Sequence, residues 1–448
     1  MDYRDPGGRT LELVVSRIAS TSPERRRGVL VVGPIGRGES SLWMPSEARK
    51  AFGGTRIPEL YDVVGLDLRG VGASSPVSCG LTAAELPARH PAASGSIEDS
   101  VAASRAVADR CGKRIGDLLP HMGTVTVARD LDRVRQALGV ARFTYYGGWY
   151  GSFLGVAYDS LFPGRVDRMV LDSPVDPARF GYATARMEGP GVEAGFGDFA
   201  RWLAERPAAY RLGATERDVR NTVLGMITEL DAAPWTGPGG QVITGNDVRT
   251  VAAAAALHRF YWLDPEPGKT GAASWLRMVH ERDNAASGAR LAARALHQTK
   301  TGAEDNGHVA EQAGNCVDGS WPRDVDQYRR LVARDRKAYP LTGGMPANIT
   351  PCAFWPATSA EPPVRPDRNG ARTILVVGAE RSPVTPHTAI LGTARALGAR
   401  PGVVTVDSND HLIGFFRQSP CANRRVDVFL ATGAIPRNPQ RCPDPRNP

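Results

Sequence analysis

The most constraining part of the sequence is a strand, a sharp turn, a helix and a second strand in direct succession. Residues 143–147 are rich in aromatic and β-branched side chains and run into GGWYG at 147–151. A helical stretch then leads to Tyr158, and the apolar run 168–172 follows. This order indicates a parallel α/β arrangement. Glycines on either side of the turn let the strand and helix backbones approach closely, and we call residues 147–151 the elbow.

Similar patterns before and after the elbow extend the expected sheet. Short apolar runs bounded by turn residues indicate strands at 10–19, 28–32, 61–67, 373–378 and 402–406. A helix is expected from Val127 to Leu138, where apolar residues recur every three or four positions, and another from Cys421 to about Leu430. We therefore expect an α/β fold with a mostly parallel sheet and flanking helices, formed by residues 1–179 and 366–448.

Residues 180–365 have a different character. They contain Ala-, Arg- and Trp-rich stretches with helical spacing, interrupted by Pro-Gly clusters. At 448 residues the chain exceeds the usual length of one domain, so a large core with a substantial insertion is expected. We predict that 180–365 form a mostly helical cap inserted into the core.

Charge and hydropathy limit the classes of partner. The net charge of +8 is spread among acidic residues, and the only tight basic run is Arg25 to Arg27, which does not favour a nucleic-acid surface. No apolar run approaches the roughly 18 residues that a membrane helix needs. The sequence therefore predicts neither a nucleic-acid nor a membrane partner, and it leaves the oligomeric state open.

The cysteines suggest disulfides between neighbours along the chain. The expected pairs are Cys79 with Cys111, Cys316 with Cys352, and Cys421 with Cys442. None of the six forms a CxxC motif, so no metal site is expected. Disulfides belong to oxidising compartments, whereas the sequence begins Met1-Asp2-Tyr3 without an apolar signal segment. We expect either a mature exported form or a cytoplasmic protein with ancestral cysteines.

Several short motifs occur in the order of a known protein family. They are YDVVG at 61–65, DLRGVG at 67–72, ARDLD at 128–132, LFPGRV at 161–166, MVLD at 169–172 and the tail from Ser419 to Pro443. In these motifs the chain resembles actinobacterial tripeptidyl-aminopeptidase-like hydrolases nearly end to end. The resemblance implies an α/β-hydrolase fold with a helical cap and a family-specific C-terminal region.

The resemblance also assigns positions to a catalytic triad. In α/β-hydrolases the middle residue of the elbow is a nucleophilic serine, but this chain has Trp149, whose indole cannot form an acyl-enzyme. The family's acid lies in a D-P-V-T-P-like motif, where this chain has Ser382. Glu380 is a candidate substitute acid. His411 follows the next strand, where the family has its histidine.

The loop that shapes the oxyanion site is altered as well. Relatives carry a glycine-rich turn whose N–H groups face the developing oxyanion. Here the matching segment is GPIGRGES at 33–40, so Gly36, Arg37 and Gly38 are expected at the pocket together with Tyr150. Of the usual machinery, only His411 and the backbone N–H of Tyr150 match the family pattern.

Two interpretations stay open for the altered residues. Trp149 either plugs a dead pocket or offers a stacking face for a flat, apolar substrate. His411 is either a leftover loop residue or a general base with a pKa near neutrality, and we favour the second.

Ser152, a conceivable displaced nucleophile, is expected to pack inward. The four histidines His121, His258, His280 and His308 lack ligand spacing, and no metal or cofactor is expected.

We therefore predict an enzyme that does not use an acyl-enzyme. Its substrate is expected to be a small organic metabolite, with polycyclic aromatic compounds among the candidates, and its chemistry acid/base catalysis at His411. By analogy, serine-less relatives suggest actinobacterial natural-product biosynthesis, with cyclisation or carbon–carbon bond formation. Two alternatives remain: a non-catalytic protein that binds a small molecule or peptide, and a peptidase or esterase with a displaced nucleophile.

Overall fold

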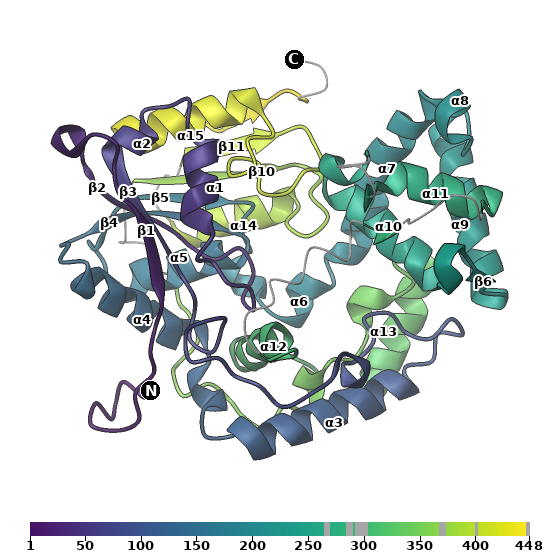
Figure 1. The fold of residues 1–448 in the computed structure, drawn as a ribbon, viewed down its shortest axis with the longest axis horizontal. Helices are drawn as coiled ribbons and strands as arrows, with labels where there is room; N and C mark the ends of the chain where they lie inside the picture. Colours follow the sequence, from purple (N-terminus) through teal and green to yellow (C-terminus); the bar gives the residue numbers. More distant parts are fainter. Residues whose placement is uncertain (264–268, 284–289, 292–302, 367–372, 399–401, 445–448) are drawn as a thin grey trace.

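The computed structural model describes residues 1–263, 269–283, 290–291, 303–366, 373–398 and 402–444. Its centre is an eight-stranded sheet in the order β1-β3-β2-β4-β5-β10-β11-β12 (Figure 1). Strand β1 is antiparallel to β3, and the other neighbouring pairs are parallel. The strands are β1 (Val15–Ile18), β2 (Gly28–Val32), β3 (Tyr61–Leu66), β4 (Phe143–Gly148), β5 (Val166–Asp172), β10 (Ile374–Ala379), β11 (Gly402–Val406) and β12 (Gln440–Cys442).

Helices cover both faces of this sheet, which explains why strands such as β2 and β10 are continuously apolar. Along β2, Val29 and Val31 join the core on one face, whereas Leu30 and Val32 join the core on the other. The first face is covered by α3 (Glu98–Ile115), α4 (Thr124–Ala137), α5 (Tyr150–Leu161) and α14 (His387–Ala396). The second face is covered by α1 (Met44–Ala51), α2 (Ile57–Leu60) and α15 (Pro420–Thr432). The predicted α/β-hydrolase architecture is confirmed.

The N-terminal strand is shorter than predicted. The expected strand at 10–19 is β1, Val15–Ile18, alone. Before it, the backbone N–H groups of Glu12 and Val14 donate to the hydroxyls of Ser75 and Ser74 at 2.9 and 2.8 Å. Because these side chains satisfy the backbone, the apolar run continues as a loop beside the sheet.

The helical region between β5 and β10 does not share a single hydrophobic core. Its helices are α6 (Tyr182–Ala185), α7 (Glu188–Ala204), α8 (Pro207–Tyr210), α9 (Glu216–Ala232), α10 (Gly245–Leu257), α11 (Ala272–Glu281), α12 (Asn306–Asp318) and α13 (Val325–Ala338). Helices α7, α9, α10 and α11 share a hydrophobic core of their own, and we call them the cap bundle (Figure 1). Helix α12 instead joins the core on the α4 face through Val309, Ala310 and Ala313.

Short strands and a second small cluster complete this region. Two-stranded pairs form between β6 (Trp235–Thr236) and β7 (Val242–Ile243), and between β8 (Lys269–Thr270) and β9 (Arg290–Leu291). Tyr328 and Val332 of α13 pack with Ile97, which directly precedes α3. Helix α13 therefore lies near α3 rather than in the cap bundle, as Figure 1 also shows.

The three predicted disulfides are present. Cys79–Cys111, Cys316–Cys352 and Cys421–Cys442 have Cα–Cα distances of 5.0, 4.7 and 5.8 Å. The last bond fixes strand β12 to the start of α15. Within the described ranges, no helix has the length and apolar character required to cross a membrane.

Candidate active site

Trp149 occupies the tight turn between β4 and α5. Its backbone has φ 42° and ψ −108°, a conformation that costs a non-glycine residue about 1–3 kcal/mol. The surrounding packing holds it there. A Cβ atom at Gly147 would lie 2.3 Å from the carbonyl oxygen of Gly151, and one at Gly151 would lie 2.4 Å from that of Pro34. The elbow therefore accepts only glycine at these two positions, although its centre is a tryptophan.

The indole of Trp149 lies against the imidazole of His411. The ring centroids are 6.5 Å apart and the planes meet at 77°, an edge-to-face arrangement. Trp149 is half-buried, so part of its side chain remains accessible. The residue at the predicted nucleophile position thus contacts the predicted histidine through an aromatic surface rather than through a hydroxyl.

His411 follows β11 in a segment that we call the histidine loop, residues 407–412. Its ring Nδ1 lies 3.1 Å from Oγ1 of Thr385 and 3.3 Å from Oγ of Ser382, and both hydroxyl residues are fully buried. Among the described residues no carboxylate is hydrogen-bonded to this ring. Burial lowers the pKa of His411 to about 3. The expectation of a base with a near-neutral pKa is therefore corrected, because nothing negative offsets the burial.

Glu380 faces away from this pair of hydroxyls. Its carboxylate accepts hydrogen bonds from Arg441 of β12 at 2.8 and 3.0 Å, and these lower its pKa. No hydrogen bond joins Glu380 to His411 within the part of the chain that the structure describes. This placement argues against Glu380 as a substitute acid. Ser382 instead occupies the position beside Nδ1 at which the family pattern places an acid.

The predicted oxyanion loop is fixed in a closed arrangement. The backbone N–H of Tyr150 donates to the carbonyl oxygen of Ile35 at 3.2 Å, so this N–H already has a partner. Arg37 lies over the Tyr150 ring, 4.5 Å from its centroid, and forms an ion pair with Asp318 of α12. A Cβ at Gly38 would lie 2.0 Å from the carbonyl oxygen of Gly307, at the start of α12.

These contacts differ from the sequence expectation in one important respect. Tyr150 was expected to offer a free N–H beside Gly36, Arg37 and Gly38. In the structure the loop itself supplies the acceptor for that N–H, and Arg37 is buried as a structural link between the core and α12. In this conformation the loop does not present the Tyr150 N–H to a ligand.

Ser152 packs inward, as expected. It is fully buried, its Oγ accepts a hydrogen bond from the N–H of Val175 at 3.1 Å, and it donates to the carbonyl of Trp149. Both interactions stabilise the start of α5. They leave Ser152 unsuited to the role of a displaced nucleophile.

Asp172 is a buried residue behind the site that the sequence revealed only as part of a motif. Its buried carboxylate accepts hydrogen bonds from the Tyr146 hydroxyl at 2.6 Å and from the N–H groups of Gly414 and Phe415 at 2.9 and 3.0 Å. Burial raises its pKa. Asp172 therefore joins the ends of β4 and β5 to the chain just after His411. A charged residue ending a buried strand was the available signal.

His258 was set aside on sequence grounds but lies beside His411. It follows the C-terminus of α10, and the two ring centroids are 5.9 Å apart. Burial lowers its pKa well below the ordinary value. The sequence signal was weak: a histidine directly before Arg259-Phe260-Tyr261-Trp262. No group of three or more potential metal ligands occurs among the residues that the structure describes.

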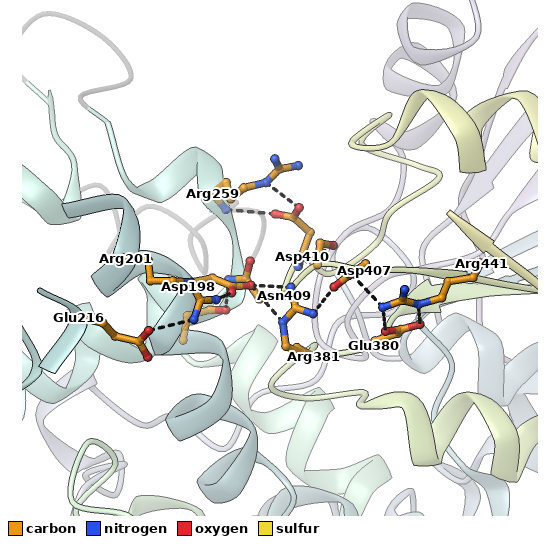
Figure 2. Close-up of polar contacts among 12 residues, drawn as sticks. Asp198, Arg201, Glu216, Arg259, Glu380, Arg381, Asp407, Asn409, Asp410 and Arg441 are labelled. Atoms are coloured by element: carbon orange, nitrogen blue, oxygen red, sulfur yellow. Dashed lines mark hydrogen bonds and ion pairs between the residues drawn. The ribbon is translucent and has the colours of Figure 1, made fainter. Parts of the chain in front are cut away.

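A chain of ion pairs fixes the histidine loop to the cap bundle (Figure 2). Arg381 binds Asp407 of the loop and, at 3.1 Å, Asp198 of α7. Arg441 binds Asp407 at 2.8 Å from the opposite side. Asp198 and Asp407 belong to different parts of the fold, so Arg381 links core and cap directly.

Family models match two parts of the chain. A model described as "TAP-like protein" matches residues 339–442, and one described as "alpha/beta hydrolase fold" matches residues 50–223. The first match covers Ser382 and His411. The second covers the elbow.

Curated relatives match over almost the whole chain. A tripeptidyl aminopeptidase of Streptomyces lividans is 32% identical over 445 residues, which cover 97% of this chain and 80% of the relative. A carboxylesterase B of Mycobacterium tuberculosis is also 32% identical, over 99% of this chain and 84% of the relative. A serine protease of the same organism, Hip1, is 29% identical over 99% of this chain and 85% of the relative.

Proposed function

Because the chain belongs to the tripeptidyl-aminopeptidase-like family of α/β-hydrolases, we propose that it is a non-hydrolytic member that binds and transforms a small, flat organic molecule. One observation carries the proposal: the elbow retains its strained geometry, but its central residue is Trp149. A tryptophan cannot attack a carbonyl carbon, since its only polar group is an N–H donor. The relatives named as peptidases and esterases therefore do not define the reaction of this chain.

The other parts of the hydrolytic machinery support the same proposal. Losing a nucleophile costs a serine peptidase about a million-fold in turnover. Losing one oxyanion donor costs about 10²- to 10³-fold more. Here the Tyr150 N–H is bound to Ile35, and the acid position is Ser382. With all three changes together, an acyl-enzyme route retains no useful rate.

The half-buried indole favours a flat ligand. Tryptophan presents a large rigid surface at low entropic cost, and aromatic partners prefer offset or edge-to-face contacts with it. The imidazole of His411 already packs edge-on against this ring. A planar ligand beside Trp149 would therefore also contact His411.

The chemistry proposed for His411 follows from its neutral state. Its pKa of about 3 makes it a weak proton acceptor at neutral pH. A neutral imidazole can still polarise a ligand oxygen by hydrogen bonding and thereby assist a reaction of the neighbouring carbon. Cyclisation or carbon–carbon bond formation in natural-product biosynthesis needs such polarisation and no acyl-enzyme.

A second candidate function is binding without turnover, and the same low pKa favours it. Without a carboxylate beside Nδ1, a protonated imidazole would be unsupported during any proton transfer. A protein with this site would hold a ligand and leave it unchanged. Comparing wild-type protein with His411→Ala separates the two: conversion by the wild-type protein that is lost in the variant supports catalysis, whereas ligand binding without conversion in the wild-type protein supports binding alone.

The main test is labelling with a fluorophosphonate probe, which forms a covalent bond only with an activated nucleophile. We expect no labelling of the wild-type protein and no hydrolysis of a tripeptide p-nitroanilide. The matched control is the folded S. lividans relative under the same conditions, which should be labelled. Stoichiometric labelling of any serine in the wild-type protein would overturn the proposal.

A further inference from the structure

The C-terminal end of α10 and the chain segment that follows it dock directly on the histidine loop. The amide of Asn409 donates to the carbonyl of Ala256 at 2.7 Å. Arg259 donates to the Asp410 carboxylate from its backbone N–H at 3.2 Å and from its side chain at 2.7 Å (Figure 2). His258 lies between Ala256 and Arg259 in the sequence. These contacts on both sides fix its ring against that of His411.

Gln418 determines which nitrogen of His258 carries the proton. Its amide Nε2 donates to the carbonyl oxygen of His411 at 3.3 Å and lies 3.4 Å from Nδ1 of His258. The carbonyl can only accept, so the amide must present its NH₂ group here. The second hydrogen then faces Nδ1 of His258, which acts as the acceptor. The proton of this neutral ring is therefore on Nε2, which becomes a donor.

The Nε2 atom of each imidazole makes no hydrogen bond to the described residues. The ring hydrogen bonds of His411 are made at Nδ1, and that of His258 is made at Nδ1. Among the described residues neither Nε2 has a hydrogen-bond partner. Both rings are neutral, because burial lowers both pKa values. Such a pair suits a neutral oxygen better than an anion.

The surroundings of the pair are aromatic. Phe260 stacks on His258 with ring centroids 4.6 Å apart, and Phe416 meets it edge-on at 6.0 Å. Phe260 and Phe416 are 47% and 41% exposed, which is high for large apolar side chains beside a buried polar pair. Trp149 contacts His411 edge-to-face. A ligand that matches these groups is a flat ring system with one polar oxygen.

From this geometry we propose that His258 and His411 form a two-imidazole site that binds the hydroxyl or carbonyl oxygen of an aromatic ligand. The inference rests on the proposed function and assigns the ligand class and a second binding residue to it. His258 comes from the cap, so the site is complete only when the cap segment is docked on the histidine loop. His411 comes from the core.

The test uses a probe pair that differs by a single oxygen, 2-naphthol and naphthalene, with affinities measured by calorimetry. We expect the wild-type protein to bind 2-naphthol at least tenfold more tightly than naphthalene, because two hydrogen bonds of about 0.5–1.5 kcal/mol each distinguish the probes. His258→Phe keeps a flat ring and removes one of the two hydrogen-bonding imidazoles, so it should reduce the preference several-fold while changing naphthalene binding far less. His280→Phe, at an exposed histidine of α11, is the matched control and should change neither affinity.

Each outcome bears on the proposal. Equal affinities of the wild-type protein for the two probes would overturn the two-imidazole site while leaving a flat-ligand site intact. An equal loss of affinity for both probes in His258→Phe would assign His258 a purely structural role and overturn the proposal. Failure of either probe to bind overturns this inference alone, since the proposed function is judged by fluorophosphonate labelling.

A measurement on the unmutated protein guards against misfolding of the variant. In ¹⁵N NMR spectra, 2-naphthol should shift the Nε2 resonance of His258, because a donor that gains an acceptor changes its electronic environment. Naphthalene should shift it far less. Equal shifts with the two probes would overturn the proposal.

Discussion

The elbow and the histidine loop differ in what each retains of the hydrolytic site. At the elbow the backbone is intact, since Gly147 and Gly151 still permit close approach around a residue with φ 42°, yet the side chain is Trp149. In the histidine loop the side chain is intact, yet the partners of His411 are the hydroxyls of Ser382 and Thr385. The first region shows that packing holds the turn geometry even around a tryptophan. The second shows that the histidine keeps its place in the fold while its hydrogen-bonding partners are hydroxyls.

The largest expected effect breaks the elbow itself. In Gly147→Ala the new Cβ would lie 2.3 Å from the carbonyl oxygen of Gly151, which is also fixed by the Tyr145 hydroxyl at 2.8 Å. Because backbone must shift, we expect a loss of about 3 kcal/mol or more in the free energy of unfolding, measured with urea.

The control for this change is Gly225→Ala on an exposed face of α9. A Cβ at Gly225 meets nothing within 4 Å. There alanine should stabilise the helix by about 0.5–1 kcal/mol. Similar effects at the two glycines would show that the elbow is not tightly packed.

The next effect concerns the attachment of the histidine loop to the cap. Arg259→Met removes the guanidinium that pairs with the Asp410 carboxylate, which is 1% exposed, and keeps the backbone hydrogen bond from residue 259. We expect a loss of about 2–3 kcal/mol, because losing a cation beside a buried carboxylate is costly and Arg259 itself is partly exposed. Urea unfolding measures the change.

Two further variants test whether the buried charge of Asp410 causes the loss of stability in Arg259→Met. Arg259→Met with Asp410→Asn should recover part of the loss, since an amide needs less compensation than a carboxylate. Arg329→Met, which removes an exposed ion pair with Glu98, should leave stability almost unchanged. If the double variant were no more stable than Arg259→Met, charge burial would not be the cause.

Acid sensitivity distinguishes the two regions, because the histidine loop contains the buried imidazole of His411, whereas burial raises the pKa of the Tyr150 phenol in the elbow, which therefore stays protonated in acid. The pKa of His411 is lowered from 6.5 to about 3 in the folded protein. Between these values the unfolded chain binds the proton and the folded protein does not, so stability falls as pH falls from 6.5 towards 3, by about 1.4 kcal/mol per pH unit for one proton. In His411→Phe the slope of the free energy of unfolding against pH should be smaller by the contribution of one proton.

Other buried histidines also make the free energy of unfolding depend on pH in this range, so His411→Phe removes only part of that dependence. His90 and His258 also have lowered pKa values because of burial. The acid slope should therefore persist in His411→Phe at a reduced level. Equal slopes in wild type and variant would contradict the assignment of His411 as a buried neutral ring.

Local patterns predicted much of the fold. The apolar runs of β2, β10 and β11 are continuous because helices bury both faces of each strand, and this leaves a direct trace in the sequence. Gly147 is required by a contact with Gly151, which is close in sequence, whereas Gly151 is required by a contact with Pro34, more than one hundred residues away. The elbow was readable from its glycine spacing, but only half of the reason for that spacing is local. The cysteine pairs followed chain order. In contrast, the residue at which the first strand begins depends on the hydroxyls of Ser74 and Ser75, about sixty residues away.

The candidate site was predictable only in part. The positions of Trp149, Ser382 and His411 follow from motifs that are local in sequence. The partner of the Tyr150 N–H and the packing of His258 arise from contacts between segments more than one hundred residues apart. Such contacts have no local periodicity, so only the folded chain reveals that the N–H is bound and that a second imidazole lies beside His411.

The smallest expected effect comes from restoring both triad side chains at once. Trp149→Ser with Ser382→Asp would place a hydroxyl in the elbow and a carboxylate near Nδ1 of His411, which should raise the pKa of the imidazole. Hydrolysis of p-nitrophenyl acetate should nevertheless stay about 10²- to 10³-fold below that of the S. lividans relative, because the Tyr150 N–H is still bound to Ile35 and a missing oxyanion donor costs about this factor. A rate within about tenfold of the relative's would mean that residues 33–40 rearrange and free the N–H. In that case the elbow and the histidine loop would differ from a hydrolase only in their side chains.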